Sequence, residues 1–235
     1  MLALTLGLGT GCNKLKARDQ LNKGVNSYKS GHYEDAIEHF KNAVALDNNL
    51  GVARLYLATA YFQQYVPGVD TPENNRSADL AIEQYQAVLD QPGVKEATKI
   101  TALKGIASLY FNEKKFEQAK EYHHKVLEVD PSDPETYYSI GVIDWSQTYQ
   151  PRMTLFNSMG IKPDEQLKDK KACQDLHDKN EPLVDDGIKV LDEAIKLRKD
   201  YDDAMAYLNL MYREKAAIDC DDPVQRQVDL KTADD

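Results

Sequence analysis

From residue 14 onward, apolar and small side chains recur every three or four positions, and polar or charged residues fill the positions between them. This spacing places the apolar side chains on one face of an α-helix. The chain contains no stretch in which apolar and polar residues alternate strictly with β-branched side chains, the pattern of a half-buried strand. The sequence therefore predicts an all-α protein.

Two segments share one pattern of apolar, small and charged residues. Residues 33–47 (YEDAIEHFKNAVALD) parallel residues 116–131 (FEQAKEYHHKVLEVDP). Both resemble the second helix of the tetratricopeptide repeat (TPR), a helix–turn–helix unit of about 34 residues. In that repeat the two helices approach most closely where the side chains are small. Small residues stand in register at position 8 of helix A and at position 20 in helix B: Gly24, Ala58, Ala107 and Gly141, then Ala36, Ala81, Ala119 and Gly187. The resemblance implies a right-handed TPR-type α-solenoid.

The spacing of these small residues divides the chain into four repeats and part of a fifth. The repeats are residues 17–50, 51–95, 100–133, 134–201 and 202–235. The spacing exceeds the repeat length in two places, which predicts insertions at residues 65–75 and 149–181, each in the turn between helix A and helix B. Within the second insertion we expect a charged helix over residues 164–179, ended by Asn180 and Pro182.

The first twelve residues have a different character. Residues 1–11 are mostly apolar, end in small residues and lead to Cys12, after which the chain becomes polar. Such a stretch is typical of a secretory signal. Ending in Thr10-Gly11-Cys12, it resembles the lipobox of bacterial lipoproteins, whose cysteine is diacylated and becomes the mature N-terminus. The resemblance implies that residues 12–235 form a TPR solenoid held at the periplasmic side of a membrane by lipid on Cys12. The alternative is an unprocessed N-terminus on a cytosolic adaptor.

The remaining cysteines are Cys173 and Cys220. If Cys12 carries a lipid anchor, these two lie in a compartment where thiols oxidise. Two outcomes stay open, a disulfide between them or two separate thiols, because the sequence does not give the distance between their Cα atoms.

A TPR solenoid presents a concave groove lined by helix A residues. The candidate groove residues are Tyr28, Thr59, Phe62, Lys104, Ser108, Phe111, Tyr138, Val142 and Trp145. Position 12 of helix A is aromatic in four repeats, which favours a groove that binds an extended peptide or a partner helix through side-chain pockets. The opposing interpretation is that these aromatic residues pack between helices. Burial of Phe111 and Trp145 would favour it.

Composition and motifs exclude several other functions. The chain has 29 basic and 39 acidic residues, a net charge of −10, which argues against nucleic acid as the main partner. It has no P-loop, G-x-S-x-G or H-E-x-x-H motif. His123 and His124 are adjacent, so their side chains point about 100° apart on a helix and cannot chelate one ion together. We therefore expect no catalytic residues, no metal and no cofactor. Cys173 and His177, four residues apart, keep open an accessory role in an enzyme.

These observations predict a non-catalytic scaffold or adaptor for protein–protein interaction. The predicted partner is a protein or peptide, and the predicted location is the periplasmic side of the bacterial cell envelope, in a membrane-anchored complex. A cytosolic TPR adaptor without lipidation, or an accessory subunit of an enzyme, are the alternatives.

Overall fold

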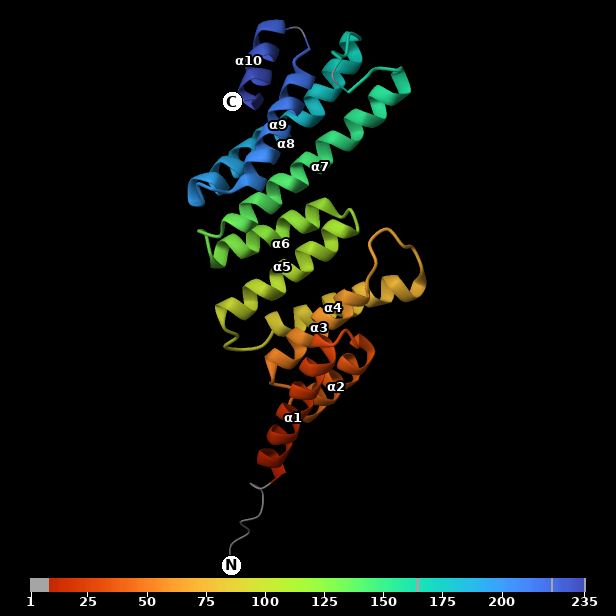
Figure 1. Cartoon of the computed structure of the whole chain (residues 1–235), viewed down its shortest axis with the longest axis vertical. Coiled ribbons are helices and arrows are strands. Elements are labelled where there is room, and N and C mark those ends of the chain that lie inside the picture. The colour runs from red at the N-terminus through yellow and green to blue at the C-terminus, as the bar shows by residue number, and fades with distance from the viewer. Residues whose placement is uncertain (1–8, 164, 221, 235) are drawn as a thin grey trace, which may run out of the picture. The chain divides into compact units, whose positions relative to one another are not determined.

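The computed structural model describes residues 9–163, 165–220 and 222–234, and in these residues it contains ten α-helices and no strand (Figure 1). The predicted all-α class is confirmed. In chain order the helices are α1 (Gly9–Lys29), α2 (Tyr33–Leu46), α3 (Gly51–Gln64), α4 (Pro72–Leu89), α5 (Glu96–Asn112), α6 (Phe116–Val129), α7 (Pro134–Met159), α8 (Lys170–Leu197), α9 (Asp202–Ile218) and α10 (Pro223–Asp234). The repeat division predicted from the sequence would group them as five successive pairs.

The chain forms two compact units, and the boundary lies within α6, between Lys125 and Val126. In the first unit each helix from α1 to α4 packs against the helix that follows it, so that the chain winds through α1, α2, α3, α4 and α5 in order. In the second unit α7 packs on α8, α8 on α9 and α9 on α10, and α7 also contacts α9. Contacts between neighbours in sequence are what a repeat solenoid requires of each unit.

The small residues predicted at position 8 leave room for a large side chain from helix B of the same repeat. A Cβ atom on Gly24 would lie 2.5 Å from Cε1 of Phe40, and one on Gly141 would lie 2.5 Å from Cγ of Leu191. Both Phe40 and Leu191 are fully buried. The small residue in helix A therefore leaves the space in which the large residue of helix B packs.

A buried asparagine organises the loop between α3 and α4. The Asn74 side chain, 7% exposed, accepts a hydrogen bond from the Val66 amide at 2.7 Å. It also donates to the carbonyl oxygens of Val66 at 2.9 Å and Val69 at 2.7 Å. The next helix begins at Pro72, and the hydroxyl of Thr71 caps it by accepting from the Asn74 amide at 3.2 Å. The Asn74 side chain thus holds Val66 and Val69 of the loop, and the Thr71 cap fixes the end of the loop at α4.

Residues 149–181 form the end of α7, a connecting loop and the first turns of α8. Gly160, with a φ of 68°, ends α7 in the left-handed conformation that glycine tolerates. The helix expected over residues 164–179 is wrong at both ends, because α8 begins at Lys170 and continues through Pro182 to Leu197. Proline inside a helix costs about 3 kcal/mol. Here the helix continues because its buried face runs across the proline, from Cys173 to Ala194.

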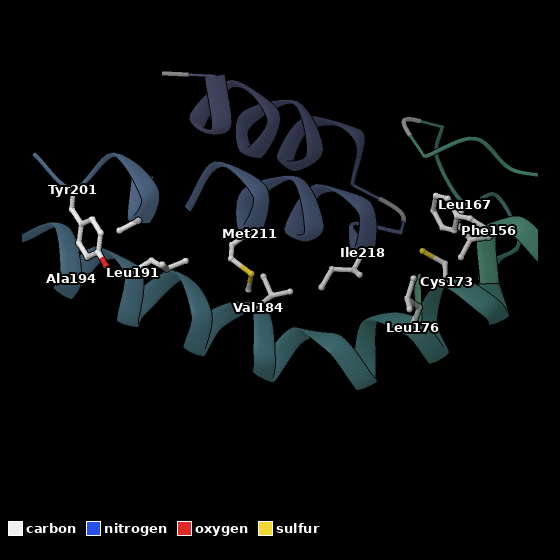
Figure 2. Packing of buried hydrophobic residues seen from close by; sticks show 11 residues of the cluster. Phe156, Leu167, Cys173, Leu176, Val184, Leu191, Ala194, Tyr201, Met211 and Ile218 are labelled. Atoms are coloured by element: carbon white, nitrogen blue, oxygen red, sulfur yellow. The ribbon is translucent and has the colours of Figure 1, made fainter. Parts of the chain in front are cut away.

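The core of the second unit lies along this long helix (Figure 2). Cys173, Leu176, Val184 and Leu191 of α8 are buried at helical spacing, and Met211 and Ile218 of α9 pack against them. Phe156 and Leu167 complete the cluster at the end of the helix that carries Cys173, as Figure 2 shows. The residues that join α7 to α8 are therefore part of the core.

Candidate functional site

The candidate groove residues lie on the first helix of each of four pairs, and their side chains are exposed to a similar extent. They come from α1 (Tyr28), α3 (Thr59, Phe62), α5 (Lys104, Ser108, Phe111) and α7 (Tyr138, Val142, Trp145). All nine are half-buried. Phe111 and Trp145 are thus not enclosed between helices, so each keeps a face that a ligand can reach. Six of the nine lie in the first unit and three in the second, and each group has its own surroundings.

In the first unit the hydroxyl groups of Thr59 and Ser108 bond to main-chain carbonyls of their own helices. The Thr59 hydroxyl donates to the carbonyl of Leu55 at 2.9 Å, and the Ser108 hydroxyl donates to the carbonyl of Lys104 at 2.9 Å. Bonding of this kind satisfies the hydroxyl within the helix. Burial raises the pKa of the Tyr28 hydroxyl above its usual range, and a hydrogen bond with Gln63 partly offsets this effect. This part of the predicted groove thus combines the aromatic residues Tyr28, Phe62 and Phe111 with the polar residues Thr59, Lys104 and Ser108.

In the second unit the candidate residues belong to a cluster of aromatic rings. The Tyr138 ring centroid lies 5.2 Å from that of Tyr201 and 5.6 Å from that of Tyr207. Trp145 stacks on Tyr149 at 4.7 Å and meets Tyr207 edge-on at 5.4 Å. These separations are typical of favourable aromatic pairs. The cluster fixes the indole ring of Trp145 while leaving part of it exposed.

Trp145 also lines a cavity of about 410 Å³ between α7, α9, α10 and the loop after α7. The lining residues are Trp145, Tyr149, Arg152, Pro163, Glu165, Leu210, Arg213, Glu214, Ala217, Arg226 and Leu230. This volume falls within the usual range of ligand sites. Nε1 of Trp145 is buried and has no hydrogen-bond acceptor among the residues that the structure describes. The second unit therefore adds a partly open pocket to the half-buried aromatic cluster.

A buried ion pair closes one side of this cavity. Nε of Arg152 donates to one carboxylate oxygen of Glu214 at 2.8 Å, and Nη2 donates to the other at 2.7 Å. Arg152 is 5% exposed and Glu214 is 2% exposed. Nη1 of Arg152 donates to the carbonyl of Pro163 at 3.3 Å, and the guanidinium lies over the rings of Tyr149 and Phe156. A bidentate pair with its other donors satisfied is the arrangement in which a buried ion pair is tolerated.

Sequence reasoning found Trp145 but not the rest of the cavity. Arg152 and Glu214 are 62 positions apart, and neither belongs to the small-residue pattern that identifies the repeats. Arg152 directly follows Pro151, in a segment that we expected to lie outside the helix pair. The one available signal was an arginine placed in an otherwise apolar stretch.

Cys173 and Cys220 are joined by a disulfide in the structure, with their Cα atoms 5.6 Å apart. The bond ties the first turn of α8 to the segment between α9 and α10. His177, expected to share a helix face with Cys173, has its Nδ1 atom 3.2 Å from the carbonyl oxygen of Ile218 and its Nε2 atom 3.5 Å from Glu181. With Cys173 in a disulfide, this pair holds no free thiol.

Other candidate chemistry concerns histidine and carboxylate groups. In the described parts of the chain, no group of three or more His, Cys, Asp or Glu side chains is placed to hold a metal ion. His123 is buried and His124 is exposed, on neighbouring positions of α6. Burial, with Asp229 next to it, raises the pKa of Asp219 to about 6.

The predicted lipidation site stands at the beginning of α1. Cys12 is a free cysteine and is exposed. Residues 1–8 of the predicted signal lie outside the described residues. Within the part of the chain that is described, no helix is both long and apolar enough to span a bilayer.

Comparison with known proteins identifies structures with a similar fold. The family model "Tetratricopeptide repeat" matches residues 105–133. A crystal structure of MamA protein is 15% identical and has a TM-score of 0.59, with 93% of this chain and 90% of that chain covered. MamA from Desulfovibrio magneticus RS-1 is 16% identical, with a TM-score of 0.58 over 93% and 89% of the two chains. YrrB, described as a TPR protein with an unusual peptide-binding site, is 12% identical, with a TM-score of 0.57 over 95% and 87%.

No curated protein matches the chain by sequence. The match to residues 105–133 shows a tetratricopeptide repeat in that segment, and the similar structures show a TPR-type solenoid fold, as the sequence predicted. A TPR fold supports a role as a scaffold for protein–protein interaction.

Proposed function

We propose that this protein is a non-catalytic scaffold that binds an extended segment of a partner protein, with one apolar side chain of that segment held in the cavity beside Trp145. The observation that carries the proposal is this cavity, which adjoins a half-buried aromatic residue predicted to line the groove. Solenoids bind partners along the helices that line their concave side. The description of YrrB, which has the same fold, as a peptide-binding TPR protein is consistent with this use of the fold.

The chemistry of the cavity favours an apolar or aromatic side chain. Trp145, Leu210, Ala217 and Leu230 provide apolar surface. The two charges on its buried side belong to one ion pair, and the other charged side chains of the lining are Glu165, Arg213 and Arg226. Burying a Leu- or Phe-sized side chain contributes about 1.5–3 kcal/mol. Trp145, fixed by its aromatic neighbours, has the character of a binding hot spot.

Binding is tested with the full chain and a library of short phage-displayed peptides. We expect selected peptides to share an apolar or aromatic residue. We expect Trp145→Ala to weaken their binding by about 2 kcal/mol, roughly 30-fold in Kd. Leu230→Ala tests the opposite wall and leaves the aromatic cluster in place. The matched control is Leu15→Ala, which removes an apolar side chain that is 69% exposed on α1. Equal affinity in all three variants would refute binding in the cavity.

We further propose that the protein is anchored to a membrane by lipid on Cys12 and works outside the cytoplasm. Exposure of Cys12 leaves its thiol accessible to an acyl-transferring enzyme. The Cys173–Cys220 disulfide is consistent with an oxidising compartment, since such bonds are rare in the cytosol.

The anchor is tested by expressing the full chain in bacteria supplied with radiolabelled fatty acid. Label in the wild type that is lost in Cys12→Ser supports the lipoprotein. The same label in both chains, or an unmodified Met1 on the mature protein, supports the cytosolic adaptor instead. Cys173→Ser serves as the control for loss of a cysteine elsewhere in the chain.

A further inference from the structure

The charged residues of the chain are unevenly distributed. Of the 29 basic and 39 acidic residues, five basic and one acidic lie on α1. Helix α1 therefore has a net charge of +4, and the remaining 24 basic and 38 acidic residues give the rest of the chain a net charge of −14. Because opposite charges attract over several ångströms in water, an anionic surface is drawn to α1 and repelled by the rest of the chain.

The positive charge is concentrated in the first turns of α1. Lys14, Lys16 and Arg18 are exposed, and none of them forms an ion pair with another described residue. The next two charges along the helix, Asp19 and Lys23, pair with each other at 2.8 Å. Residues 12–18 contain no carboxylate. Three cations at the start of α1 are therefore available to an external anion.

The carboxylates of the neighbouring helix lie away from these cations. Helix α2 packs on α1 and begins four residues after α1 ends, so its first turn lies beside the last turn of α1. That first turn carries Glu34 and Asp35. The remaining carboxylate of α2, Glu38, pairs with Lys41 at 2.7 Å. The acidic residues of α2 thus leave the charge at the start of α1 in place.

An exposed apolar residue lies between the cations and the predicted lipidation site. Leu15 is 69% exposed and stands three positions from both Cys12 and Arg18, and Lys16 stands four positions from Cys12. Residues three or four apart are neighbours on a helix surface. The fully buried Ala17 marks the opposite side of the helix. One exposed face therefore combines the exposed thiol, an apolar side chain and flanking cations, as in helices that lie at a lipid–water boundary.

We propose that this face of α1, over residues 12–18, binds the anionic headgroups of a phospholipid bilayer and holds the start of α1 against the membrane. The inference rests on the proposed lipid anchor at Cys12, which brings this face to a bilayer. Each Lys or Arg at an anionic lipid surface strengthens binding about fivefold, so three of them strengthen it by up to about 100-fold. The acidic remainder of the chain is repelled from the same surface, which favours a single orientation.

The proposal is tested on the full chain with one alkyl chain attached chemically to Cys12. With Cys173 and Cys220 joined in a disulfide, a maleimide that carries a myristyl chain reacts at Cys12 alone. One such chain binds bilayers with an affinity of about 10⁴ M⁻¹, which is weak enough for an added contact to be measured. Sedimentation gives the partition onto phosphatidylcholine vesicles and onto vesicles with about 30% phosphatidylglycerol. Residues 1–11 have no charged side chain, so their contribution cancels in the ratio.

We expect the wild type to prefer the anionic vesicles by at least about tenfold at about 0.1 M salt, because repulsion of the acidic remainder offsets part of the 100-fold limit. The preference should disappear at about 1 M salt, where charges are screened within about 3 Å. The triple variant Lys14→Gln/Lys16→Gln/Arg18→Gln should partition equally onto both kinds of vesicle at either salt concentration.

The matched control is Lys95→Gln/Lys99→Gln/Lys171→Gln. It removes the same charge from three exposed lysines outside α1 and should keep the preference. Leu15→Ala tests the apolar part of the face without changing its charge. It should weaken binding to the anionic vesicles about fivefold and leave the salt dependence unchanged.

Four results would overturn the lipid-binding face. Equal partition of the wild type onto both kinds of vesicle at low salt is the first, and it requires no substitution. A preference that persists in the α1 triple variant is the second, and an equal loss in the control variant is the third, because it indicates a response to net charge alone. The fourth is self-association of the chain without vesicles that the α1 triple variant abolishes, which would assign the face to a second copy of the chain.

The lipid-binding face and the lipid anchor fail separately, because attachment through maleimide does not require acylation in the cell. Preference for anionic vesicles, without fatty-acid label on Cys12 in bacteria, refutes the anchor and supports the affinity of the face for anionic lipid. Label that is lost in Cys12→Ser, together with equal partition onto both kinds of vesicle, supports the anchor and refutes the lipid-binding face.

Discussion

The disulfide between Cys173 and Cys220 gives the sharpest test of the second unit. The perturbation is Cys220→Ser in a Cys12→Ser background, so that the free thiol at the N-terminus cannot enter a new bond. The half-buried position 220 accepts a hydroxyl more readily than the fully buried position 173. Reduction of the parent chain by a dithiol removes the same bond without any substitution.

The expected loss follows from the 47 positions that separate the two cysteines. In the chain-entropy model, a closed loop of this length lowers the entropy of the unfolded chain enough to stabilise the fold by about 4 kcal/mol at 25 °C. With a urea dependence of about 2 kcal/mol per molar, the unfolding midpoint should fall by about 2 M.

The assay is urea unfolding followed by tryptophan fluorescence. The chain contains one tryptophan, Trp145, which lies in the second unit and therefore reports on that unit. The substitution and the dithiol should shift the midpoint by the same amount. A shift below about 0.5 M in both experiments would refute the stabilising role of the bond, as would two cysteines that are freely alkylated in the unreduced chain.

Three other substitutions test the packing described above. Arg152→Met leaves the Glu214 carboxylate buried without a cation and should lower the free energy of unfolding by about 3–5 kcal/mol in the same fluorescence assay. An unchanged free energy of unfolding would show that water reaches the ion pair. Gly141→Ala should lower the free energy of unfolding by about 1–3 kcal/mol because the added methyl group meets Leu191, although alanine is the better helix former. A higher melting temperature of this variant would contradict the close packing of Leu191 on Gly141. Asn74→Ala removes three hydrogen bonds to the loop after α3 and should speed amide exchange in the loop by at least tenfold. Unaltered exchange would show that the loop keeps its conformation without these bonds.

Most of the fold could be predicted because it depends on local spacing. The small residues at position 8, such as Gly24 and Gly141, mark where a large residue of helix B must fit. This requirement can be recognised in the sequence from the spacing of the residues. The continuation of α8 through Pro182 was not predictable from local rules. A proline penalty is a property of the local chain, but the buried face that outweighs it becomes apparent only once α9 packs against the helix.

The candidate site was predictable in part for the same reason. Trp145 occupies a position that the repeat assigns to the groove, and the structure leaves it half-buried as such a role requires. The ion pair behind it joins Arg152 to Glu214, residues with no shared pattern in the sequence. Pairs of this kind depend on tertiary structure, because each charge is tolerated in a buried position only when the fold brings the other charge next to it.

The loop after α3 has a further property that follows from the atoms to which Asn74 bonds. All three of its partners are main-chain atoms, the amide and carbonyl of Val66 and the carbonyl of Val69. Every amino acid has such a carbonyl, and every one except proline has such an amide. The exposed side chains of Val66 and Val69 can therefore change during evolution without altering the path of the loop, provided that position 66 does not become proline. Position 74 bears the constraint that these three bonds impose, whereas Gly68, with a φ of 80°, and the capping Thr71 are constrained for their own reasons, and the side chains at positions 66 and 69 are left open to variation.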